Sequence, residues 1–225
     1  RRVCFQAIAA GAAVAVCDEL AASDDKFPAQ VDGLGESDAQ RVRDVASQFL
    51  EKYAVPGLSW AAARHGKLSA TGTFGWANVA DKTPVRPENL FRVASVSKPI
   101  TAITIFKLVE EGSLGLSHRV FARNGLLRKY CDGIPLDPVS RGRLQAITVQ
   151  HLLEHTSGGW RNGEHDPMFV RASLGKNHSD LIRWTRRSVP LENTPGTKYA
   201  YSNFGYCLLG RLIEVTGLRK DGSEI

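Results

Sequence analysis

The chain has 225 residues, of which 43% are hydrophobic and 23% are charged, and its formal net charge is +6. These proportions are close to globular averages, so they exclude wholesale disorder and a multi-span membrane protein. The length suits one large domain, or one domain with an appendage. Because the basic residues are scattered without an interleaved aromatic platform, we expect a mildly basic solvated surface and no nucleic-acid partner.

The amino-terminal segment has the composition of an export signal. Arg1 and Arg2 precede an almost uncharged run, residues 3–16, which is too short to span a bilayer. We therefore expect residues 1–25 to be a leader, with the arginine pair indicating the twin-arginine route, and the protein to be periplasmic or secreted without a stable membrane span after leader removal. A loosely packed amino-terminal helix is the alternative. Residues 26–36 are expected to form a polar linker.

The pattern of the next segment predicts a helix followed by a β-hairpin. Ser37 and Gln40 have the spacing of a capping box, and apolar residues at helical spacing follow over residues 42–53. Residues 58–63 and 68–76 are separated by a polar turn and predict the two strands of a hairpin.

The remainder of the chain is expected to be mostly helical. Helices are predicted over residues 98–111, 148–155 and 206–215, and another from a Ser179 cap to Arg187, while residues 113–146 are expected to be irregular. A helix and a hairpin followed by many helices predict an α+β fold with a helical subdomain. The four cysteines form no C-x-x-C pair, so neither a disulfide framework nor a structural zinc site is expected; they are Cys4, Cys17, Cys131 and Cys207.

The spacing Ser-x-x-Lys can bring a serine hydroxyl near a lysine amine, because residues three apart meet on one helix turn. Only one of its occurrences begins a strongly apolar helix, whose amino terminus favours a developing anion. We therefore take Ser95 and Lys98 as candidate nucleophile and base, against the alternative of an ordinary serine at a helix start. Pro99 predicts an irregular start of this helix. The three occurrences are Ser23/Lys26, Ser95/Lys98 and Ser173/Lys176.

A Tyr-x-Asn motif, Tyr201 and Asn203, precedes the last predicted helix. Alternate residues of an extended segment share a face, so the phenol and the carboxamide can point the same way. A phenol near a cation can shuttle protons, and an amide can orient a substrate. The alternative is a buried tyrosine beside an asparagine helix cap.

Together these motifs resemble the serine β-lactamase/penicillin-binding-protein family, and most closely its class C-like esterase and β-lactamase-related branch. The matching segments are residues 55–58, 91–102, 148–158 and 195–206. The resemblance implies a β-lactamase/transpeptidase-like fold, an antiparallel sheet flanked by helices with a helical subdomain, over residues 37–225.

The same resemblance implies a role for each motif residue. Ser95 would be the acylated nucleophile, and its backbone N–H would supply half of an oxyanion hole. Lys98 would take the serine proton, Tyr201 would act as base or protonate the leaving group, and Asn203 would help to hold the substrate. The substrate would be an ester or an amide, such as a β-lactam, a D-alanyl peptide or a carboxylester. Association of the protein with the cell wall would be compatible with such substrates. No cofactor and no metal are implied.

The third motif of that family, Lys-Thr-Gly or His-x-Gly on a strand, is not found, and residues 220–222 predict a turn. Because members of the family continue through further strands, we expect the chain to be C-terminally incomplete and residues 1–225 alone to be inactive. Two alternatives stay open: a catalytically inactive, ligand-binding relative, and a zinc peptidase using the H-x-x-E-H pattern of His151, Glu154 and His155. The aromatic residues expected either to line a cleft or to pack in the core are Trp160, Phe169 and Trp184.

Overall fold

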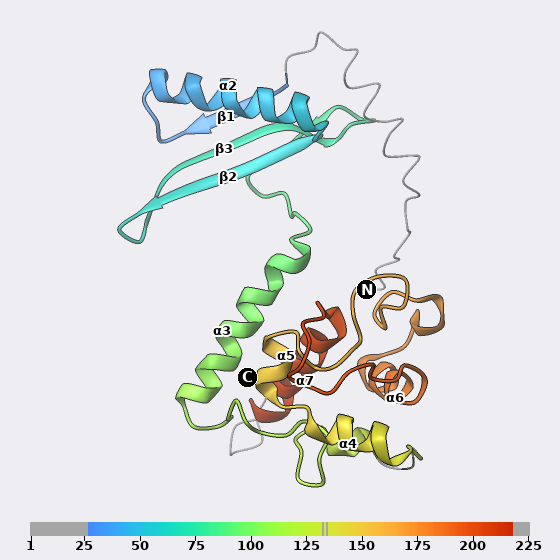
Figure 1. Ribbon diagram of the computed structural model, residues 1–225. Helices are drawn as coiled ribbons and strands as arrows, with labels where there is room; N and C mark the ends of the chain where they lie inside the picture. Colours follow the sequence, from blue (N-terminus) through green and yellow to red (C-terminus); the bar gives the residue numbers. More distant parts are fainter. Residues whose placement is uncertain (1–26, 132, 134, 218–225) are drawn as a thin grey trace. The chain divides into compact units, whose positions relative to one another are not determined.

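A computed structural model of the protein describes residues 27–131, 133 and 135–217 (Figure 1). The chain divides into two compact units between Arg92 and Val93, and each unit is described by itself. Within the described residues, no helix is both long enough and apolar enough to cross a membrane. The expected leader, the Ser23/Lys26 pair and the turn at residues 220–222 lie outside the described residues.

The amino-terminal unit contains the predicted hairpin. Strands β2 (Gly57–Arg64) and β3 (Lys67–Asn78) pair antiparallel. His65 and Gly66 join them at φ angles of 51° and 73°, which are the left-handed conformations that a two-residue hairpin turn requires. The β-hairpin prediction is therefore confirmed.

Two short strands and one helix complete this unit. Strand β1 (Ala29–Asp32) pairs with β3 on the edge opposite β2, so the segment expected to be a linker contains a strand. Strand β4 (Thr83–Pro84) pairs with the end of β3. Helix α2 (Glu36–Tyr53) lies along one face of the sheet (Figure 1) and buries Ala46 and Leu50 against Phe74.

The predicted capping box at the start of α2 is wrong. Gly35 is the residue before the helix, and its carbonyl accepts the N–H groups of Asp38 and Ala39. The side chain of Gln40 donates to Asp44 instead of reaching back toward the helix start. Backbone acceptors therefore satisfy the first turn without a side-chain cap.

The second unit begins with the helix that carries Ser95. A short 3-10 turn, η1 (Ala94–Val96), leads into α3 (Ser97–Glu110), so the irregular start predicted from Pro99 is confirmed. Ala94 has a φ angle of 42°. A non-glycine residue in this left-handed region costs about 1–3 kcal/mol, so the surrounding contacts must hold it in place.

The other predicted helices are confirmed with shifted ends: α5 (Val149–Leu153), α6 (His178–Ser188) and α7 (Asn203–Thr216). The cap of α6 is Asn177 and not Ser179, because the Asn177 side chain accepts the Asp180 N–H.

One helix lies where irregular structure was expected. Helix α4 (Pro138–Ala146) falls inside residues 113–146, and that part of the prediction is wrong. The side chain of Asp137 accepts the N–H groups of Val139 and Ser140, and Pro138 occupies the first helical position. Both features are typical of a helix start.

The core of the second unit forms where α7 packs against α3 and α5. Leu208, Leu209 and Leu212 of α7 are completely buried, and each contributes about 1.5–3 kcal/mol through removal of its side chain from water. Trp160 is also buried and meets Phe204 edge to face, with ring centroids 5.0 Å apart, so it belongs to the core. Of the other two aromatic candidates, Trp184 is half-buried against this core and Phe169 is exposed.

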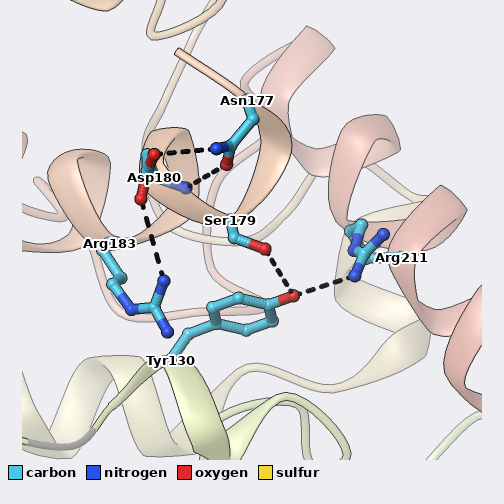
Figure 2. Close-up of polar contacts among 6 residues, drawn as sticks. All are labelled: Tyr130, Asn177, Ser179, Asp180, Arg183 and Arg211. Atoms are coloured by element: carbon cyan, nitrogen blue, oxygen red, sulfur yellow. Dashed lines mark hydrogen bonds and ion pairs between the residues drawn. The ribbon is translucent and has the colours of Figure 1, made fainter.

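A partly buried polar cluster joins α6 and α7 to the segment before α4 (Figure 2). The hydroxyl of Tyr130, in the 3-10 turn η2 (Arg128–Tyr130), lies 3.3 Å from Ser179 Oγ and accepts a 3.0 Å hydrogen bond from Arg211 Nη2. Burial raises the pKa of Tyr130, but the hydrogen bonds from Ser179 and Arg211 and the charges of Arg211 and Lys129 outweigh it, so the net shift is downward. The cluster fixes the middle of α7, the helix whose first residue is Asn203.

Two cysteines lie in the described part of the chain: Cys131, whose thiol donates to the Phe121 carbonyl at 3.5 Å, and Cys207, which is a free thiol. Cys207 is on α7, where burial raises the pKa of its thiol to about 11. A thiol with so high a pKa is almost entirely protonated at neutral pH and is therefore a weak nucleophile.

Candidate active site

Ser95 and Lys98 meet across the junction of η1 and α3. Lys98 Nζ donates a 3.2 Å hydrogen bond to Ser95 Oγ, which is possible because one turn of helical backbone separates the two residues. Ser95 is exposed, whereas Lys98 is half-buried. By contrast, Ser173 is buried and its hydroxyl donates to the Val170 carbonyl at 2.7 Å, as expected for a structural serine.

Tyr201, which is 106 residues away along the chain, contacts the same serine. Its hydroxyl donates to Ser95 Oγ at 2.7 Å, and Lys98 Nζ lies 4.7 Å from the centroid of its ring. Two hydrogen bonds lower the pKa of the Tyr201 phenol below its ordinary value of 10.0; the bond with Lys98 has the larger effect and the bond with Ser95 the next largest. The phenol is therefore easier to deprotonate than a free tyrosine and can exchange a proton with the serine.

Asn203 holds Lys98 from the amino terminus of α7. The carboxamide Oδ1 of Asn203 accepts a 2.7 Å hydrogen bond from Lys98 Nζ. The helix cap is Ser202, whose hydroxyl accepts the Gly205 N–H at 2.9 Å. Because Ser202 supplies the cap, the side chain of Asn203 is free to reach Lys98, and the alternative of Asn203 as helix cap is wrong.

The His155 ring packs against the Tyr201 ring. Its ring centroid lies 4.5 Å from that of Tyr201 and 5.0 Å from that of Tyr206. Its Nδ1 accepts the Ser202 N–H at 3.0 Å, and its carbonyl accepts the Ala200 N–H at 2.7 Å. Burial, and then the Lys98 charge, lower the pKa of His155, which favours the neutral imidazole that can accept this bond. The turn after α5 therefore positions the Tyr-x-Asn segment.

The two histidines of the H-x-x-E-H pattern make structural hydrogen bonds to backbone N–H groups. His151 Nδ1 accepts the Thr148 N–H at 3.3 Å and completes a capping box at the start of α5, while His155 contacts the Tyr-x-Asn segment. Among the residues that the structure describes, no three His, Cys, Asp or Glu side chains gather to hold a metal ion. The zinc alternative thus lacks a third ligand in this part of the chain.

Two residues that the sequence did not single out also touch Asn203. Its Nδ2 donates to Asp166 Oδ2 at 2.7 Å and lies 3.3 Å from Asn162 Oδ1. The Asn162 N–H in turn donates to the Tyr201 carbonyl at 2.7 Å. Both residues lie in an irregular loop without hydrophobic periodicity, and an Asp before a proline was the sole signal for one of them.

The arrangement provides the parts of a nucleophilic site. One serine hydroxyl is exposed to a reactant, and an amine and a phenol lie within hydrogen-bond reach of it. Either of these groups can receive the serine proton when it is itself deprotonated, since these separations serve donation in both directions.

A sheet unit, a helical unit and this serine-centred cluster together define a β-lactamase/transpeptidase-like protein. Residues 42–220 match the family model described as Beta-lactamase, so the chain belongs to the β-lactamase family, as the sequence resemblance predicted.

Named relatives support the same family. The chain is 32% identical over 158 residues to penicillin-binding protein 4* of Bacillus subtilis (strain 168), covering 68% of this chain and 31% of that protein. It is also 32% identical over 185 residues to esterase EstB of Burkholderia gladioli, covering 78% and 45%.

A solved structure of a class C β-lactamase is similar with a TM-score of 0.61 and 25% identity, covering 82% of this chain and 46% of that one. The β-lactamase/transpeptidase-like fold expected from the sequence is confirmed. The chain spans less than half the length of each of these three proteins.

Proposed function

We propose that the protein is a serine hydrolase that cleaves an ester or an amide through an acyl-enzyme on Ser95. The observation that carries the proposal is the convergence of two proton-transferring groups on one exposed hydroxyl: Lys98 Nζ at 3.2 Å and Tyr201 OH at 2.7 Å. An activated serine needs such a partner within hydrogen-bond reach.

The proposed reaction has two halves. In the first, Ser95 Oγ bonds to the substrate carbonyl carbon while its proton passes to the Lys98 amine, which must be deprotonated for this step, with Tyr201 assisting, and the Ser95 N–H donates to the developing oxyanion. The bond to the leaving oxygen or nitrogen then breaks, and Tyr201 returns a proton to that atom. In the second half, water adds to the acyl carbon, its proton enters the same relay, and Ser95 regains its hydrogen as the acid departs.

The substrate class follows from what the relatives have in common. An esterase, a penicillin-binding protein and a class C β-lactamase appear among the similar proteins. The compounds in those names, an ester, a penicillin and a β-lactam, each contain an acyl group attached to oxygen or nitrogen, so we infer an ester or amide substrate. Export to the periplasm or the exterior, inferred from the amino-terminal sequence, would bring the protein to cell-wall peptides.

Covalent labelling tests this proposal. The full-length protein is incubated with an acylating nitrophenyl ester or a β-lactam, and its intact mass is measured. We expect an adduct in the wild type and in Ser97→Ala, the matched control two residues along the same segment, and no adduct in Ser95→Ala.

An adduct that survives in Ser95→Ala would show that another residue is acylated. Binding of the probe without any change of mass in the wild type would favour the ligand-binding alternative instead. Ser173→Ala should leave labelling intact, because that hydroxyl is buried against the Val170 carbonyl.

A further inference from the structure

The orientation of the Asn203 carboxamide decides whether it can hold Lys98. Its oxygen accepts from Lys98 Nζ, and its nitrogen donates to Asp166 Oδ2, each at 2.7 Å. If the amide were turned over, its NH₂ group would face the N–H of Lys98 that its oxygen now accepts, and its oxygen would face the Asp166 carboxylate. Both hydrogen bonds would then be lost, because each would join two donors or two acceptors.

Asp166 is itself firmly held. Its exposed fraction is 0%, and Oδ1 accepts the Met168 N–H at 2.9 Å in a local turn. One carboxylate oxygen is thus used within the turn, and the other is directed at Asn203. A buried carboxylate needs such donors, since burying an unpartnered charge is very costly.

We propose that Asp166 is a positioning residue of the site, which fixes the Asn203 carboxamide with its oxygen toward Lys98 and thereby holds the Lys98 amine beside Ser95. This inference rests on the proposed function of Ser95 and Lys98. Asp166 acts through Asn203 and makes no contact with Ser95.

The charge of Asp166 also reaches Tyr201. The groups that face Tyr201 are Lys98 from α3, His155 from the turn after α5, Tyr206 from α7 and Asp166 from the loop. The Lys98 contact lowers the pKa of Tyr201, whereas the Asp166 charge opposes that effect and raises it. The Lys98 hydrogen bond is the larger of the two effects, so a change at Asp166 that releases Lys98 should raise the pKa of Tyr201.

The test compares Asp166→Asn with Glu164→Gln, which removes an exposed acid from the same loop. The acylation rate constant of the full-length protein is measured from pH 5 to 10. Asp166→Asn should acylate about 10- to 100-fold more slowly, as expected when a reacting group is displaced. The limb of its pH profile that reports Tyr201 should move to higher pH, because a displaced Lys98 no longer lowers the pKa of Tyr201, while Glu164→Gln should match the wild type.

A double-mutant cycle separates positioning from a general structural role. If Asp166 acts through Asn203, then adding Asp166→Asn to Asn203→Ala should cause no further loss of rate. Additive losses would overturn the proposal, as would an Asp166→Asn rate and pH profile equal to those of Glu164→Gln. Loss of labelling specificity for Ser95 would instead overturn the proposed function, so the two failures are distinguishable.

A second measurement uses the wild type and does not depend on the acylation rates of the variants. In a ¹⁵N-resolved spectrum, the Asn203 side-chain amide is assigned by its disappearance in Asn203→Ala. Held by hydrogen bonds to Lys98 and Asp166, it should show slowed hydrogen exchange relative to exposed asparagine amides. An Asn203 amide that exchanges as fast as an exposed one would refute the positioning role.

Discussion

Replacing Tyr201 by phenylalanine removes one oxygen atom and leaves the ring. The ring keeps its neighbours, since His155 lies 4.5 Å and Lys98 Nζ 4.7 Å from it, and neither contact uses the hydroxyl. The change therefore removes the hydroxyl's hydrogen bond with Lys98 and its 2.7 Å bond with Ser95 Oγ, with little change in packing.

The effects on stability and on rate should differ. Each hydrogen bond contributes about 0.5–1.5 kcal/mol to stability, so losing the two should lower the free energy of unfolding by about 1–3 kcal/mol at most. General acid–base catalysis contributes about 10²–10⁴ in rate, so acylation should slow by that factor, or about 3–5 kcal/mol of barrier. A large kinetic loss with a small loss of stability is the signature of proton transfer by this phenol.

Stopped-flow acylation by a nitrophenyl ester, with thermal unfolding alongside, measures both quantities. Tyr199→Phe is the matched control, because Tyr199 is exposed, lies two residues earlier and also contacts the His155 ring. If Tyr201→Phe acylates within about threefold of Tyr199→Phe, far below the general acid–base range, Tyr201 transfers no proton and this reasoning fails.

Three further outcomes are expected. Lys98→Arg should retain less than about a tenth of the acylation rate, because arginine keeps its proton, while Lys107→Arg on the same helix should retain it all; a higher rate for Lys98→Arg would make Lys98 a positioning charge. Because folding lowers the pKa of His155 from 6.5, the unfolded chain binds a proton at this residue more readily than the folded chain does. The stability contributed by neutral His155 is therefore complete above pH 6.5 and is lost as the pH falls through the folded pKa. Urea unfolding should show a weaker pH dependence in His155→Asn over that range. Leu209→Ala, at a completely buried position, should cost about 2–5 kcal/mol of unfolding free energy, measured by urea unfolding, and a cost below 1 kcal/mol would contradict the packing described for α7.

Strong local patterns made most of the fold predictable. The hairpin followed from apolar runs around His65 and Gly66, and α7 followed from helical spacing that ends at Gly217. Helix α4 was not predicted, although its start carries a recognisable signal: Asp137 is a typical cap and Pro138 a typical first residue. The capping box at Ser37 and Gln40 failed because a spacing of two residue types does not reveal which backbone carbonyl already satisfies the helix start.

The candidate site was predictable only as far as its motifs. The structure brings Ser95, Lys98, Tyr201 and Asn203 together, as the paired motifs predicted, while their chemical roles remain proposals. The sequence signal at Asp166 is weak, an Asp before a proline, because its contact with Asn203 joins residues 37 apart along the chain and its burial lies in a loop.

Lys98 joins two segments of the chain that folding must first bring together. It contacts Ser95 three residues before it and Asn203 105 residues after it, so the cluster exists only when α3 and α7 are packed. That packing depends on buried leucines of α7 and on Ile105 of α3, well away from the reacting atoms. The position of the lysine amine is therefore controlled twice, by apolar burial that sets the distance between the helices and by the Asn203 carboxamide that sets the direction. Because the first control acts on folding and the second on the geometry of the folded site, substitutions in the core should reduce the amount of active protein. Substitutions at Asn203 should instead reduce the acylation rate constant of the correctly folded protein.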